Sequence, residues 1–149
     1  MVEVSQPAFT GLSSYQQNLL ISAIISCINS YRGSSLYSDG TLISYASTRA
    51  ADSSYCWSHT RPDGTRGCDM ISSDKWRGEN LCKVCISSGF TGSDDQIYAL
   101  ASRIVSDWAG SSGHYANMVC GDFTYVGVYT YASVSGDSVT FYTAAMFSN

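Results

Sequence analysis

The spacing of apolar residues changes in the final third of the chain, and this change restricts the folds open to it. Earlier, apolar residues at helical spacing predict helices over residues 13–32, 39–54 and 93–110. Later, side chains alternate as in strands over residues 123–131 and 138–147, with Ser135-Gly136-Asp137 as the hairpin turn. Helices followed by an antiparallel hairpin predict an α+β fold, with helices packed around a small, mainly antiparallel sheet.

The second and third predicted helices can be read in more detail from their spacing. Leu42, Tyr45, Ala46, Arg49 and Ala50 fall on its successive turns, and Asp39 supplies an N-cap. On the third predicted helix, Trp108 lies on the apolar stripe, so we expect it in the core.

Charge and hydrophobicity exclude several classes of protein. The chain has 149 residues, of which 44% are hydrophobic, so it is long enough for a core and too apolar to be disordered. Eight basic against twelve acidic residues leave no basic face for nucleic acid or anionic lipid. The longest apolar run, residues 19–28, is too short for a transmembrane segment, which takes about 20 residues. We expect one domain over residues 1–149, with residues 1–12 as a short extension.

The start of the chain and its cysteines favour an oxidising location. No basic residue precedes the run at 19–28, so it is not a signal peptide, and we interpret Met1 as the start of a fragment without its leader. Six cysteines in so small a chain favour disulfides and secretion, with 15 possible pairings. The alternative is zinc, because Cys82-Lys83-Val84-Cys85 is a C-x-x-C motif, although a structural zinc site needs a second pair that this sequence lacks.

Histidine and glutamate are scarce, which narrows the search for chemistry. The chain has two histidines, His59 and His114, and two glutamates, Glu3 and Glu79. Both histidines lie in Gly/Ser-rich segments typical of turns. Two imidazoles and one carboxylate would give three ligands and an open position, the pattern of a catalytic zinc site. The spacing alone leaves open that the histidines have only structural roles.

Four segments together resemble one known family. The first segment, Ile28-Asn29-Ser30-Tyr31-Arg32, is similar to an N-x-x-R element, and the third, Gly78-Glu79-Asn80-Leu81, is similar to GENL. The second combines Arg49-Ala50-Ala51-Asp52, similar to RA-x-E, with Ser58-His59-Thr60-Arg61-Pro62-Asp63-Gly64, similar to SHTRPDG. The fourth combines Asp107-Trp108 with Ser111-Ser112-Gly113-His114-Tyr115-Ala116-Asn117-Met118, and is similar to W-x-x-S-x-GHY-x-N. In this order they resemble the CAP superfamily (cysteine-rich secretory proteins, antigen 5 and pathogenesis-related 1), especially its bacterial SCP-like branch. The resemblance runs from about residue 17 to residue 147.

The resemblance implies an α-β-α sandwich with an open cleft, in which two histidines and an acidic residue bind a divalent metal in several relatives. Carried over to this sequence, the metal ligands are His59, Glu79 and His114. Many members have a further glutamate where this chain has Ser111, so only Asp107 or Asp52 could complete the acidic set. The remaining residues expected in or behind the cleft are Ser58, Arg61, Asp63, Asp107, Ser111 and Tyr115, with Arg61 and Asp63 fixing the turn that aims His59.

We therefore expect a secreted or cell-surface module that binds zinc or another divalent metal, together with a small-molecule, lipid or protein ligand. One alternative is a hydrolase with a histidine base, Glu79 as its orienter and Ser58, Ser111 or Ser112 as nucleophile. No G-x-S-x-G motif supports it, so binding is expected rather than catalysis. The other alternative is an adhesion domain with a vestigial cleft, using Tyr125, Tyr129, Tyr131 and Tyr142, which otherwise form cross-strand pairs.

Overall fold

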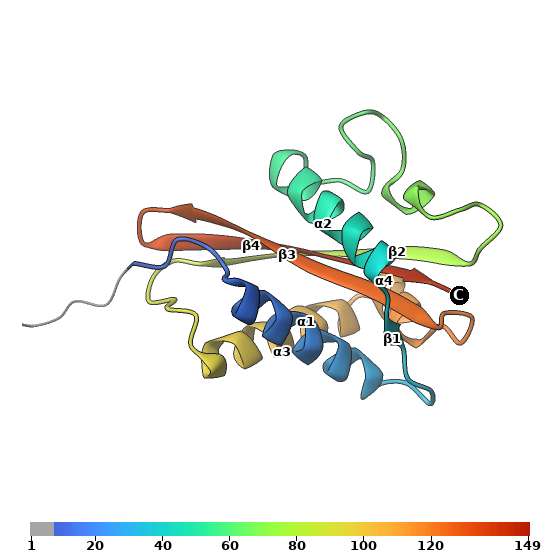
Figure 1. The fold of residues 1–149 in the computed structure, drawn as a ribbon, viewed down its shortest axis with the longest axis horizontal. Helices are drawn as coiled ribbons and strands as arrows, with labels where there is room; N and C mark the ends of the chain where they lie inside the picture. The colour runs from blue at the N-terminus through green and yellow to red at the C-terminus, as the bar shows by residue number, and fades with distance from the viewer. Residues whose placement is uncertain (1–7) are drawn as a thin grey trace, which may run out of the picture.

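A computed structural model describes residues 8–149 of the chain. Four helices, four strands and one 3₁₀ turn follow each other along this part of the chain (Figure 1). Their bounds are α1 (Ser14–Asn29), β1 (Tyr37–Ser38), α2 (Gly40–Tyr55), η1 (Gly67–Met70), β2 (Arg77–Ile86), α3 (Asp94–Ala109), α4 (Ser112–Val119), β3 (Tyr125–Ser135) and β4 (Ser138–Ser148).

The four strands form one mixed sheet in the order β1-β3-β4-β2. The short β1 is parallel to β3, whereas β4 pairs antiparallel with both β3 and β2. Helix α2 covers one face of this sheet, and α1 and α3 cover the other (Figure 1). The predicted α-β-α sandwich with a mainly antiparallel sheet is therefore confirmed.

The larger core lies between the sheet and the helices α1 and α3. Ser13 and Ser93 cap these helices, and each accepts a hydrogen bond from the backbone N–H three residues later. Trp108 is 1% exposed, and its indole N–H donates to the carbonyl of Leu81 at 2.9 Å, so its predicted place in the core is confirmed. Fully buried side chains in this cluster include Leu20, Ile24, Ile28, Ile97, Ile104, Phe141 and Phe147.

A smaller core holds α2 against the other face. Its buried members are Leu42, Ala46, Ala50, Ile71, Leu81, Ala144 and Met146. The helix comes so close to β3 at Gly127 that a Cβ there would overlap the backbone of Leu42 and Ile43. This close approach carries most of the stripe of α2 into the interior, including Arg49, which is 0% exposed, while Tyr45 stays partly exposed.

The predicted helices and hairpin are confirmed to within a few residues, but four elements were missed: β1, the 3₁₀ turn η1, β2 and α4. Strand β2 was not predicted because polar residues sit among its apolar ones, and the polar side chains of Glu79 and Asn80 are buried. Helix α4 was not predicted either, so the turn expected around His114 is wrong: this residue lies on a helix. The two-residue β1 carries no periodic signal.

The structure shows none of the expected disulfides. All six cysteines lie in the described residues, and all are free. In β2 successive side chains point to opposite faces, so Cys82 is buried toward α3 while Cys85 is exposed on the other side. The C-x-x-C motif therefore brings no two thiols together for a disulfide or for zinc. Burial raises the pKa of the Cys82 thiol to about 12, which makes it a poor metal ligand.

Two further predictions concern the ends of the chain and the membrane. Residues 1–7 of the expected N-terminal extension lie outside the described part. The part that is described joins the core, because the ring of Phe9 packs edge-on against Phe90 at 4.9 Å between centroids. Over residues 8–149, every helix is too short or too polar to cross a bilayer.

Candidate functional site

A buried ion pair between α2 and β2 positions the other groups of the site. Arg49 donates from Nε to Glu79 Oε2 at 2.7 Å and from Nη2 to Glu79 Oε1 at 3.1 Å. The side chain of Arg49 is 0% exposed and that of Glu79 3% exposed. Such a two-point contact between a planar guanidinium and a carboxylate fixes both groups in orientation as well as in distance.

The same arginine also holds the loop that carries His59. Arg49 donates to the carbonyl of Ser58 at 2.7 Å and to Asp52 Oδ2 at 2.9 Å. Asp52 in turn accepts from Arg61 Nε at 2.8 Å. The loop is therefore tied to α2 on both sides of His59. From the sequence we paired Arg61 with Asp63, which lies 3.8 Å from it, whereas its closer contact is with Asp52.

His59 completes this network by contacting Glu79. Its Nδ1 lies 2.9 Å from Glu79 Oε1, while the side chain as a whole is 61% exposed. Burial would raise the pKa of Glu79, but the hydrogen bonds from His59 and Arg49 outweigh it and hold this pKa below its ordinary value. The carboxylate is thus ionised at neutral pH and accepts the Nδ1–H of His59. In the neutral ring, the tautomer that donates from Nδ1 carries its lone pair on Nε2.

The second histidine faces the first from helix α4. The ring centroids of His59 and His114 are 6.3 Å apart, with an angle of 43° between the ring planes. Burial and the nearby His59 lower the pKa of His114, so its imidazole is neutral at pH 7. Two asparagines tie α4 to β2: Asn80 donates to the carbonyl of His114 at 3.0 Å, and Asn117 donates to Asn80 Oδ1 at 3.0 Å.

Two glycines give these groups room. A Cβ at Gly67 would overlap Glu79 Oε2 and Arg49 Nε. The backbone N–H of Gly67 also donates to the carbonyl of His59 at 2.8 Å. A Cβ at Gly78 would lie 3.0 Å from Asn117 Oδ1, tighter than an ordinary contact. The ion pair therefore fits only because Gly67 of η1 presents bare backbone to it, while Gly78 of β2 leaves room for the side chain of Asn117.

These groups border a polar hollow of about 260 Å³. The residues that line it are His59, Arg66, Cys68, Arg77, Gly78, Glu79 and Asn117. Arg77 is held in place, because it forms an ion pair with Asp69 at 3.0 Å and donates a hydrogen bond to the carbonyl of Ile71 at 2.8 Å.

The donor set fits a divalent metal only in part. Both oxygens of Glu79 already accept hydrogen bonds from Arg49 or His59. No group of three His, Cys, Asp or Glu side chains among residues 8–149 could hold a metal ion. Two zinc–nitrogen bonds of about 2.0–2.1 Å in a tetrahedral site would bring the ring centroids to roughly 5 Å. The imidazoles of His59 and His114, at 6.3 Å, are near that separation but not at it.

The other predicted cleft residues are spread more widely. Ser58 and Arg61 belong to the network, whereas the carboxylate of Asp63 accepts from the backbone and hydroxyl of Thr65 in an exposed turn. Ser111 is the N-cap residue of α4 and makes no side-chain cap bond. Tyr115 packs edge-on against Tyr31 at 6.2 Å between centroids, away from the hydrogen bonds of His59.

Among residues 8–149, no further acidic residue joins His59, Glu79 and His114 to complete the predicted set of metal ligands. Asp52 is committed to Arg49 and Arg61. Asp107 pairs with Arg103 on the surface of α3 at 3.4 Å. The possibility that either one replaces the glutamate missing at Ser111 is therefore not supported by their contacts.

Sequence reasoning missed Arg49, Asn80 and Asn117 as members of the site. Arg49 had a detectable signal, because it is a charged residue on the apolar stripe of a helix and so requires a buried partner. The asparagines stood within the quoted motifs, but no pattern indicated that their amides bond to one another and to the backbone of α4.

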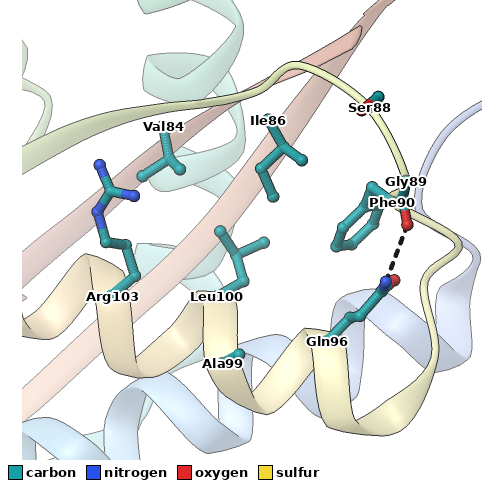
Figure 2. Close-up of a pocket in the computed structure, with 9 residues that line it drawn as sticks. All are labelled: Val84, Ile86, Ser88, Gly89, Phe90, Gln96, Ala99, Leu100 and Arg103. Atoms are coloured by element: carbon teal, nitrogen blue, oxygen red, sulfur yellow. Dashed lines mark hydrogen bonds between the residues drawn. The ribbon is translucent and has the colours of Figure 1, made fainter. Parts of the chain in front are cut away.

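An apolar hollow of about 270 Å³ lies apart from the histidines, between the end of β2 and α3 (Figure 2). Figure 2 shows the ring of Phe90 between Ile86 and Gln96, which donates to the carbonyl of Gly89 at 2.9 Å. The residues that line it are Val84, Ile86, Ser88, Gly89, Phe90, Gln96, Ala99, Leu100 and Arg103. Arg103 is its one ionisable group, so this hollow lacks the acid–base groups of the polar one.

Comparisons with solved structures support the fold. An outer surface protein from Borrelia burgdorferi superposes with a TM-score of 0.63 at 18% identity, covering 94% of this chain and 97% of that one. An extracellular protein containing an SCP domain from Bacillus anthracis gives a TM-score of 0.60 at 22% identity, covering 96% of this chain and 44% of that one. NaASP2 with Zn²⁺ gives a TM-score of 0.52 at 15% identity, covering 91% and 81%.

The sequence comparisons agree with the resemblance carried by the motifs. No curated protein matches the chain in sequence. The profile of the cysteine-rich secretory protein family, CAP, matches residues 26–146. That range includes His59, Glu79, His114 and the buried Arg49. Because the match spans well over half of its length, this chain belongs to the CAP family.

Proposed function

We propose that this chain is an extracellular or cell-surface binding domain whose cleft takes its ligand at His59 and His114. The observation that carries the proposal is the bond from His59 Nδ1 to a Glu79 carboxylate that Arg49 already fixes. A carboxylate behind an imidazole selects the tautomer with a free Nε2, which is the arrangement found behind metal-binding and catalytic histidines. An exposed surface histidine would not need a buried arginine to position its partner.

The extracellular location is supported by the family and by two names among the structural neighbours. These describe an outer surface protein and an extracellular protein with an SCP domain. The free cysteines lend no support to it, because their pairing was the original reason to expect secretion.

Within this proposal, the two imidazoles act as an open ligand set for a divalent cation such as zinc. A cation bound there would polarise a ligand or lower the pKa of a bound water. Glu79 would not be a ligand: its role is to hold His59. Two protein ligands predict weaker binding than the three or four of an ordinary zinc site.

The hydrolase alternative lacks a nucleophile in the structure. No serine hydroxyl among the described residues is hydrogen-bonded to either imidazole; Ser58 Oγ accepts from the backbone N–H of Thr60 instead.

The adhesion alternative rests on the hairpin tyrosines. Of the four, Tyr131 and Tyr142 are a cross-strand pair, as predicted, whereas Tyr125 lies opposite Ser148 and Tyr129 opposite Ala144; Tyr131 is 42% exposed.

Calorimetric titration with zinc, after removal of metals with a chelator, tests the proposal. We expect binding to wild type and none to His59→Ala or His114→Ala. A Cys56→Ser/Cys85→Ser variant is the matched control, because it removes two exposed thiols, a kind of group that zinc also binds, while leaving both imidazoles. Glu79→Gln should weaken the affinity by about 10–100-fold, since the partner that orients His59 loses its charge.

The same titration at several pH values adds a second check. Imidazole must be neutral to coordinate a metal, so affinity should fall below about pH 6. Affinity unchanged between about pH 7.5 and pH 5, or binding retained by both histidine variants, would contradict the proposal and favour a structural cluster.

A further inference from the structure

The walls of the polar hollow carry more positive than negative charge. Its one carboxylate, Glu79, is neutralised by Arg49 from outside the hollow. Two arginines line it as well, Arg66 and Arg77. Arg77 is paired with Asp69, but Arg66 has no carboxylate partner among residues 8–149. The lining therefore includes one arginine, Arg66, that is exposed and has no carboxylate partner among residues 8–149, and a second, Arg77, that is held in place.

We infer that the hollow beside His59 is an oxyanion subsite, in which Arg66 and Arg77 bind the phosphate or carboxylate group of a small ligand. The inference rests on the proposed function, because His59 borders the hollow and would contact the same ligand. It adds the chemical class of the small ligand: an anion rather than a neutral lipid.

Three features of the hollow suit an oxyanion. Guanidinium groups are fixed forks of N–H donors whose geometry matches phosphate and carboxylate. Arg77 is held by Asp69 and by the carbonyl of Ile71, so little side-chain entropy is lost when it binds. The volume of about 260 Å³ is just below the range of pockets for drug-sized ligands, about 300–1,000 Å³, and therefore suits one anionic group with a small body.

The hollow also contains a cysteine whose rate of alkylation can report whether an anion is bound. Cys68 lines it, half-buried and free, whereas Cys56 and Cys85 are exposed elsewhere. An anion held by the arginines would cover Cys68 and slow its alkylation by neutral iodoacetamide. The rates at Cys56 and Cys85 in the same sample correct for any general effect of the added salt.

The experiment measures these three rates by mass spectrometry on the metal-free full chain, with phosphate, acetate, acetamide or sodium chloride at matched ionic strength. With a Kd of about 5 mM, phosphate at about 50 mM should slow alkylation of Cys68 roughly tenfold and leave Cys56 and Cys85 unchanged. Protection by phosphate alone would identify a phosphate ligand, and protection by both anions a site for either group. Equal protection by acetamide or chloride, or none by either anion, would overturn the inference.

Variants separate this inference from the proposed function. Arg66→Gln should abolish the protection of Cys68 by phosphate, Arg66→Lys should restore part of it, and Arg103→Gln on α3 is the control. Each variant is scored by its own ratio of rates with and without anion. Arg66→Gln should still bind zinc like wild type, whereas His59→Ala and His114→Ala should not. Protection that persists in Arg66→Gln, or that requires zinc, would show that the arginines are not the binding groups.

Discussion

Replacing Arg49 by methionine would remove the group on which the site is built while keeping most of the side-chain volume. Arg49 makes four hydrogen bonds, two to Glu79 and one each to Asp52 and the carbonyl of Ser58. Without it, Glu79 Oε2 has no partner, and Oε1 retains only His59. A carboxylate 3% exposed would then be left inside the protein with little compensation.

The expected loss follows from that burial. Removing one member of a buried ion pair costs about 3–5 kcal/mol, because the remaining charge stays desolvated. For a domain of this size, this corresponds to a fall in melting temperature of roughly 10 °C. By contrast, Arg103→Met removes a surface pair whose side chains are 61% and 45% exposed, and should cost less than about 1 kcal/mol.

Urea unfolding followed by circular dichroism measures both variants, with an unchanged m-value as the condition for comparison. The double variant Arg49→Met/Glu79→Gln adds a stricter requirement. It should be more stable than Arg49→Met alone, because it removes the stranded charge. If Arg49→Met costs no more than Arg103→Met, or if the losses of the two single variants simply add, Arg49 and Glu79 do not stabilise the fold as a pair.

Two other predictions concern stability. The folded state lowers the pKa of Glu79, so its contribution is fully present above the unfolded value of about 4.3 and is lost as pH falls through the folded pKa. Acid unfolding should therefore be less steep in Glu79→Gln, measured by urea midpoints between about pH 6 and pH 3; equal pH dependence in both proteins would refute this. Trp108→Phe removes the indole N–H that satisfies the carbonyl of Leu81 and should cost about 1–3 kcal/mol. A loss below about 0.5 kcal/mol in urea unfolding would mean that water replaces this bond.

The parts of the fold that local signals define were predictable from sequence. Ser13, Asp39 and Ser93 each mark a helix start, and each caps its helix in the structure. Strand β2 could not be predicted in this way, because its buried polar side chains find their hydrogen-bond partners only in other parts of the fold. Glu79 needs Arg49 from α2, and Asn80 needs α4.

The site could be predicted as a set of residues but not as an arrangement. The motifs identified His59, Glu79 and His114, and the structure brings the first two into contact and the two rings to 6.3 Å. That Glu79 faces Arg49 rather than an open metal position depends on how α2 docks on the sheet. No spacing within a motif encodes that docking. A lone arginine on the apolar stripe of a helix does indicate, however, that a buried acidic or polar group must pair with it.

Because Arg49 holds the loop of His59, ligand binding in the cleft and local unfolding of α2 are thermodynamically linked. If α2 detaches from the sheet, Arg49 withdraws from Glu79 and from the carbonyl of Ser58 together. The cleft therefore exists only while that helix is docked, and any ligand bound at His59 raises the free energy of opening the helix by mass action. Amide hydrogen exchange along α2 should then slow when the cleft is filled, although the helix itself touches no ligand.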